Sequence, residues 1–168
     1  IDAKLIVAAS EINADMLYAT KFFAPDSFIY FEFRGRSYSV MSDLEIDRAH
    51  HQAKVNKILS LSHIQRKLFK EAHRMTDTAA VIDWIFTQKQ LKNVQVPYEF
   101  PTGLAGKLRR RGFKVIPKPG AFFEERQIKQ EREIREISKA QKIAEKGLSL
   151  GIEMIRKSKI NSNKRLIL

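Results

Sequence analysis

Two aromatic and β-branched runs, FIYFEF and RSYSVM, constrain the fold most strongly, because only Arg34-Gly35 separates them. Strand-forming runs on either side of a two-residue break that contains glycine predict a β-hairpin. The strands of a hairpin are antiparallel, whereas parallel neighbours need a longer crossover connection, usually a helix. A sheet that holds this hairpin together with helix-linked strands is therefore expected to be mixed.

The rest of the first 120 residues predicts strands that alternate with helices. Short apolar runs predict strands at residues 4–10, 57–61, 93–97 and 113–117. Helices are expected at residues 12–20, just after Ser42, and at residues 63–73, 76–91 and 102–111. Asn13 and Thr102 are the expected N-caps, and Ser42 with Glu45 forms an expected capping box. This alternation predicts an α/β fold with a mixed β-sheet flanked by helices.

From about residue 124 the sequence predicts one long amphipathic helix. Its expected apolar stripe is Ile128, Ile134, Ile137, Ala140, Ile143, Ala144 and Leu148. The i,i+4 support for this helix is mixed, since Glu131 is paired with Arg135 but Glu145 with Ser149. We therefore divide the chain into a domain at residues 1–120 and a segment at residues 121–168 that contains the long helix.

Both ends of the sequence lead us to expect a piece of a longer protein. The chain starts without an initiator Met, and its last residues, INSNKRLIL, look like the beginning of a new element. In such a piece the apolar stripe of the long helix has no surface to lie against. We expect that helix to fray, to swing out, or to pack against a second copy of the chain.

The charge balance leaves nucleic acid as a candidate partner. The formal net charge is +12, and the basic excess lies after residue 60. Arg109, Arg110, Arg111 and the helix around Arg132 could contact phosphates, but an exposed basic helix end that suits the helix dipole is the favoured explanation. The lack of cysteine excludes disulfides, thiolate metal sites and a cysteine nucleophile. No apolar run approaches the roughly 18 residues of a membrane span, so no membrane partner is expected.

One stretch, MSDLEIDRAHH, concentrates possible metal ligands: Asp43, Glu45, Asp47, His50 and His51. A calcium-binding EF-hand loop would need glycine and glutamate where this sequence has Arg48 and Lys54. Two adjacent histidines do not fit the H-E-x-x-H spacing of a zinc peptidase, and on a helix they point about 100° apart. We therefore expect an ordinary, solvent-exposed helix start here, and the chain shows no other catalytic constellation.

Two parts of the sequence carry a family resemblance. NADMLYATKFFAPDSFIYF (residues 13–31) and then RSYSVMSDLEIDRA (residues 36–49) resemble the amino-terminal domain of the Xaa-Pro aminopeptidase, prolidase and creatinase family. That family pattern has Asn-Ala, then Tyr-x-Thr-Gly-Phe, a hairpin and a Ser-Asp step, and Lys21 stands at its glycine. ERQIKQEREIREISKAQKIAEKGL (residues 125–148) resembles the linker helix that begins the family's catalytic domain. Together they cover nearly the whole chain.

This resemblance implies a non-catalytic piece of a metallopeptidase. The family's catalytic domain has a pita-bread fold and holds two divalent metal ions (Mn, Co or Zn) with two Asp, one His and two Glu. All five ligands would lie beyond residue 168, so these residues themselves would hold no cofactor and would be inactive alone. The implied partners are the chain's own catalytic domain, a second copy in a homo-oligomer, and peptide substrates of the whole protein.

The resemblance also implies a role for one loop. In the family, loops of the amino-terminal domain restrict the entrance to the partner subunit's active site, and the matching loop here is residues 21–28. The residues expected to line such an entrance are Tyr18, Phe22, Phe23 and Asp26. The alternative is that these aromatic side chains only pack the turn.

Three functional hypotheses remain at this point. The first is a cytoplasmic, non-catalytic N-terminal domain of a Xaa-Pro aminopeptidase- or prolidase-like metallopeptidase. It would serve dimerisation and active-site gating for the release of an N-terminal residue before proline. The second is a stand-alone basic nucleic-acid-binding module. The third, a catalytically inactive member of the family, depends on sequence beyond residue 168.

Overall fold

The computed structural model describes residues 1–72, 76–160 and 166–167, and the chain divides into two compact units, residues 1–124 and 125–168. The elements of the first unit are β1 (Ala3–Ala8), α1 (Ala14–Thr20), β2 (Phe28–Phe33), β3 (Arg36–Met41), α2 (Ile46–Gln52), β4 (Lys57–Ser60), α3 (Leu61–Ala72), α4 (Thr78–Gln88), β5 (Asn93–Pro97), α5 (Thr102–Arg110) and β6 (Lys114–Lys118). Strands therefore alternate with helices as the sequence predicts. His73, the last residue of one predicted helix, lies outside the described residues.

The first unit is built on a mixed six-stranded sheet with the strand order β4-β3-β2-β1-β5-β6. The predicted hairpin is confirmed, since β2 and β3 are antiparallel and Phe33 pairs with Arg36. Arg34 and Gly35, the two loop residues, both have positive φ, at 49° and 69°. Such loops match the right-handed twist of the strands. The pairs β3–β4, β1–β5 and β5–β6 are parallel, and β1–β2 is antiparallel.

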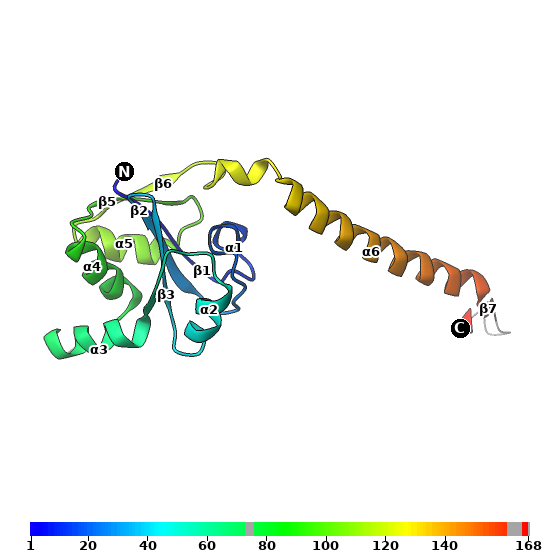
Figure 1. Ribbon diagram of the computed structural model, residues 1–168, viewed down its shortest axis with the longest axis horizontal. Helices are drawn as coiled ribbons and strands as arrows, with labels where there is room; N and C mark the ends of the chain where they lie inside the picture. The colour runs from blue at the N-terminus through cyan, green and yellow to red at the C-terminus, as the bar shows by residue number, and fades with distance from the viewer. Residues whose placement is uncertain (73–75, 161–165, 168) are drawn as a thin grey trace. The chain divides into compact units, whose positions relative to one another are not determined.

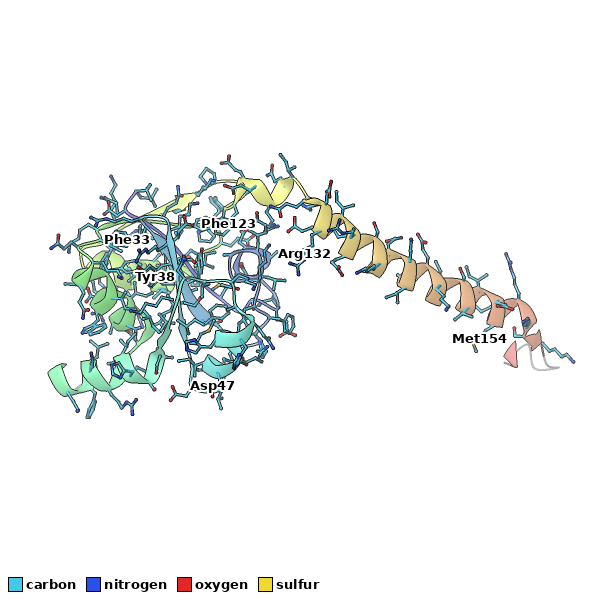
Figure 2. All side chains as sticks on the ribbon, viewed as in Figure 1. Phe33, Tyr38, Asp47, Phe123, Arg132 and Met154 are labelled. Atoms are coloured by element: carbon cyan, nitrogen blue, oxygen red, sulfur yellow. The ribbon has the colours of Figure 1, made fainter. Side chains whose placement is uncertain are left out.

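Helices cover both faces of this sheet. Helices α3, α4 and α5 lie on one face, and α1 and α2 lie on the other (Figure 1). Successive side chains of a strand point to opposite faces, so Phe31 belongs to the first layer and Tyr30 to the second. Figure 2 shows Tyr38 on the side of α4 and Phe123 on the side of α1. The first unit is therefore a three-layer α/β domain with a core on each side of the sheet.

Two predicted helix caps are wrong. Ser42 and Glu45 do not form a capping box, because α2 begins after Glu45 without a side-chain cap and the Glu45 carboxylate accepts from Arg48 instead. The N-cap of α5 is Pro101 rather than Thr102, because the Pro101 carbonyl already accepts the Ala105 N–H at 2.9 Å. The predicted cap at Asn13 is confirmed, since its side chain accepts from the Met16 N–H at 2.8 Å.

The second unit contains the predicted long helix, α6 (Glu131–Lys157), after a short 3₁₀ turn, η1 (Glu124–Gln127). The helix starts later than predicted because Gln130 and Glu133 form a capping box at its N-terminus. Ile128 therefore lies before α6 and does not belong to its stripe. The predicted i,i+4 pair is confirmed, with Arg135 Nη1 at 3.7 Å from a Glu131 oxygen. Strands β7 (Lys159–Ile160) and β8 (Leu166–Ile167) pair after the helix.

No helix in the described parts of the chain is both long and apolar enough to cross a membrane.

Asp77 connects the start of α4 to the C-terminal end of α5 in the first unit. One oxygen of its carboxylate caps α4 by accepting the Ala80 N–H at 2.9 Å. The other oxygen accepts from the Lys107 ammonium at 2.8 Å. Arg111 Nη2 lies 3.7 Å from the oxygen that caps α4. The hydrogen bond from Lys107 is the main reason that the pKa of Asp77 lies below its usual value. This carboxylate is therefore bound in its charged form.

Asp77→Ala is expected to lower the free energy of unfolding by about 1 kcal/mol at neutral pH, chiefly through the lost N-cap. The ion pairs add little because Asp77 and Lys107 are about half exposed. A lowered folded-state pKa gives stability that is present above the unfolded-state pKa and is lost as the pH falls through the folded value.

Urea unfolding of the wild type and of Asp77→Ala, at neutral pH and at about pH 2, tests this. The lower pH lies well below the usual pKa of an aspartate carboxyl. The difference between the two proteins should shrink at the lower pH. Glu99→Ala, at an exposed turn residue, is the control and should change the stability little at either pH. An Asp77→Ala effect that is equally large at low pH would contradict the assignment.

Candidate functional site

The acidic stretch after β3 is occupied by structural contacts. Asp43 accepts from the Ser62 hydroxyl at 2.7 Å and from the Ser60 hydroxyl at 3.3 Å, which ties the loop to the end of β4. Glu45 is held by the Arg48 guanidinium, with Nε at 2.9 Å. Asp47 lies on the outer side of α2, exposed to solvent (Figure 2). Across residues 1–72, 76–160 and 166–167, no three His, Asp or Glu side chains are grouped so that they could hold a metal ion.

The loop at residues 21–28 is held by hydrogen bonds at Lys21 and at Ala24. Lys21 ends α1 in the left-handed conformation, with φ 50° and ψ 25°, and its N–H bonds the Leu17 carbonyl at 2.7 Å. The residue that follows a helix in this left-handed conformation is usually glycine. Farther along, the Ala24 N–H donates to the buried Ser10 hydroxyl at 2.7 Å, and the Glu11 N–H donates to the Ala24 carbonyl. The loop therefore has a defined shape, although lysine occupies the glycine position.

The four predicted entrance residues divide into two pairs. Phe22 is fully buried, meets Phe28 edge-to-face at 6.2 Å, and has the Arg48 guanidinium 4.4 Å from its ring centre. Tyr18 is half-buried, and its ring lies 5.7 Å from the ring of Phe123. By contrast, Phe23 is 53% exposed and Asp26 is exposed. Of the four side chains, only those of Phe23 and Asp26 are exposed to solvent.

A surface depression of about 300 Å³ lies beside this loop. Its walls come from the ends of β1 and β3, the start of β2, and the loops that contain Asp26 and Leu44. Leu44 is 89% exposed, and the sequence analysis did not single it out because the residues around it are possible metal ligands. The sequence signal that could have identified Leu44 is an apolar residue between two acidic residues, Asp43 and Glu45. The depression and the exposed pair of loop residues together form the candidate functional site.

The basic residues proposed for nucleic acid are in part used internally. Arg109 donates to the Val115 carbonyl at 3.2 Å, and Arg111 donates to Asp83 at 3.3 Å and lies close to Asp77. These contacts fasten α5 to β6 and α4. Nothing in the described residues supports nucleic acid as the partner of this basic helix end.

Comparison with solved structures identifies proteins that share this fold. An X-Pro aminopeptidase from Thermotoga maritima superposes with a TM-score of 0.73 at 16% identity, over 95% of this chain and 42% of that chain. A prolidase from Pyrococcus furiosus superposes with a TM-score of 0.65 at 18% identity, over 95% and 41% of the two chains. This chain has the fold of the amino-terminal domain of X-Pro peptidases. The predicted fold is thereby confirmed.

This X-Pro peptidase-type fold is shared far beyond detectable sequence similarity. No protein-family model and no curated protein matches the sequence. An Xaa-Pro aminopeptidase chain from Streptococcus thermophilus superposes with a TM-score of 0.53 at 15% identity, over 76% of this chain and 86% of that one. The present chain spans about two fifths of the length of the Thermotoga and Pyrococcus proteins.

The neighbours Phe22 and Phe23 allow a matched test of the loop's two sides. Phe22→Ala is expected to lower the free energy of unfolding by about 3–5 kcal/mol, because it empties a buried aromatic site. Phe23→Ala should change it by no more than about 0.5 kcal/mol, since that ring is largely in solvent. Chemical denaturation of both variants measures the difference. Equal effects would show that the loop is not oriented as described.

Proposed function

We propose that residues 1–120 are the non-catalytic amino-terminal domain of an X-Pro peptidase, and that residues 121–168 form the linker and the first helix of its catalytic domain. The shared fold carries this proposal, because it extends over 95% of this chain and only about two fifths of the peptidases. The peptidases named X-Pro aminopeptidase and prolidase act on bonds next to proline, and the whole protein would do the same. In this proposal, the two divalent ions would be held by residues of the catalytic domain, outside residues 1–168.

Helix α6 supports this division. Ile134, Ile137, Ile143 and Leu148 are between 51% and 74% exposed, and no described residue of the helix is buried. An apolar stripe of this length needs a covering surface. A following catalytic domain would supply it, and the helix would then be the first element of that domain.

The role of the first unit would be dimerisation and gating. Phe23 and Asp26 would project toward the active-site entrance of the partner subunit, where the ring limits the room for residues that follow proline. The loop's anchors at Ser10 and Leu17 would keep this obstacle in place. Tyr18 and Phe22 would hold the loop from below rather than contact the peptide.

The intact protein provides the test of catalytic assignment. We expect its mass to exceed the 19.5 kDa of these residues by roughly the size of a further domain. We also expect it to cleave an Xaa-Pro dipeptide or tripeptide after loading with Mn²⁺, Co²⁺ or Zn²⁺. The 168-residue chain should have no such activity. Peptidase activity in the isolated chain, or a natural protein that ends at Leu168, would refute the proposal.

The gating role is tested in the intact protein with Phe23→Ala and Asp26→Ala. Both should raise kcat/KM for peptides of six or more residues by about three- to tenfold, since removal of a small steric obstacle is worth around 1 kcal/mol, with little change for a tripeptide. Ile12→Ala is a suitable control, because Ile12 is 86% exposed and lies outside the loop. An equal rise for short and long peptides would contradict a gate.

A further inference from the structure

Strand β4 ends the six-stranded sheet and has one strand neighbour, β3. It is four residues long, and Ile58, Leu59 and Ser60 are only half-buried. Within the described parts of the chain, no strand pairs with its outer edge. The backbone groups on such an edge can pair with an added strand from another molecule.

A groove of about 450 Å³ lies against β4, and all four residues of the strand line it together with Tyr38 of β3. Its apolar floor includes Ile64 of α3 and Ile85 of α4, with Trp84 half-buried beside them. A second hollow of about 300 Å³, lined by Arg36, Tyr38, Asn56 and Lys57, adjoins it at the start of β4. The two hollows share Tyr38 and Lys57 as lining residues.

The groove is lined by basic side chains from three elements. Lys57 comes from β4, His63 and Lys67 from α3, and Lys89 follows α4. Among the described residues that line it there is no aspartate or glutamate. Two of the ammonium groups lie over aromatic rings, Lys67 at 5.7 Å from Trp84 and Lys89 at 4.6 Å from Tyr38. Such cation–π contacts position a lysine without neutralising its charge.

We propose that this groove binds an acidic peptide segment in an extended conformation, which pairs with β4 as a further strand and places its carboxylates against Lys57, Lys67 and Lys89. Backbone pairing would supply part of the affinity, and the alternate side chains would supply the specificity. The proposal concerns a surface outside the loop at residues 21–28 and does not depend on the peptidase assignment.

Two other occupants fit the surface less well. A second copy of the chain would bring its own Lys57, Lys67 and Lys89 against the same set, and such like-charge contacts are unfavourable. A nucleic acid would satisfy the charge, but it would leave the strand edge of β4 unpaired. An extended acidic peptide satisfies both the charge and the edge.

Trp84 makes the groove directly observable, because it is the chain's only tryptophan. A ten-residue peptide of alternating Glu and Val, titrated into the 168-residue chain, should change the Trp84 emission saturably. The same peptide with Lys for Glu should leave the emission unchanged. A Glu-Val peptide with alternate N-methylated amides should bind at least about tenfold more weakly, because it cannot form the strand ladder, and tenfold corresponds to about 1.4 kcal/mol.

Charge reversal locates the site. The double variant Lys67→Glu with Lys89→Glu should weaken the binding of the Glu-Val peptide by about tenfold or more. Lys114→Glu with Lys146→Glu changes the net charge equally at exposed positions on β6 and α6, and it should change binding less than about twofold. Lys67→Gln with Lys89→Gln removes the two positive charges without reversing them and should weaken binding less than the double Glu variant. Circular dichroism checks that each variant is folded.

The same titrations can overturn the proposal. Equal binding of the N-methylated peptide would show that charge alone acts and that β4 gains no strand. Equal loss of affinity in the Lys114/Lys146 control would show that binding is not located at the groove. Tighter binding of a ten-nucleotide thymidine oligomer than of the Glu-Val peptide would assign the surface to nucleic acid instead.

Discussion

Burial of β2 on both faces is the constraint on which the first unit depends. Its first four residues are buried, and they alternate between the two layers of helices. On one side Phe31 stacks on Tyr38 at 4.7 Å and meets Phe86 edge-to-face at 5.3 Å. On the other, Tyr30 meets Phe123 at 6.5 Å. A strand that is apolar on both faces has to lie inside the sheet, so the hairpin must have further strands on either side and helices above and below.

That arrangement was predictable because its signals are local. Arg34-Gly35 interrupts two strand-forming runs, and both residues adopt the positive φ that a two-residue hairpin loop requires. Asn13 has its cap partner three residues away. The order of the strands in the sheet could not be predicted in this way. Strand β5 pairs with β1 although about ninety residues separate them in the chain, and no short sequence pattern marks that pairing.

Some of the local predictions were wrong because the structure uses other contacts than those that the residue spacing favours. Glu45 has the right spacing for a capping box, but the Arg48 guanidinium binds its carboxylate. Ile128 fits the apolar stripe by residue type, but the capping box between Gln130 and Glu133 starts the helix after it. Similarly, Phe22 and Phe23 are indistinguishable by residue type, and only the packing of the loop buries one and exposes the other. The groove beside β4 could not be found in the sequence, because its lysines come from separate elements.

Lys21 shows how a fold can persist at 16% identity. The turn after α1 needs a residue in the left-handed region, where glycine has no steric cost and a lysine costs about 1–2 kcal/mol. Here the lysine ammonium lies 3.9 Å from the centre of the Tyr18 ring, and such a contact is worth about 0.5–1 kcal/mol at an exposed site. It offsets part of the backbone strain, and the hydrogen bonds at Leu17 and Ser10 maintain the rest of the loop. The turn thus adopts the left-handed geometry with a lysine where a glycine is usual, so no glycine marks the end of α1 in the sequence.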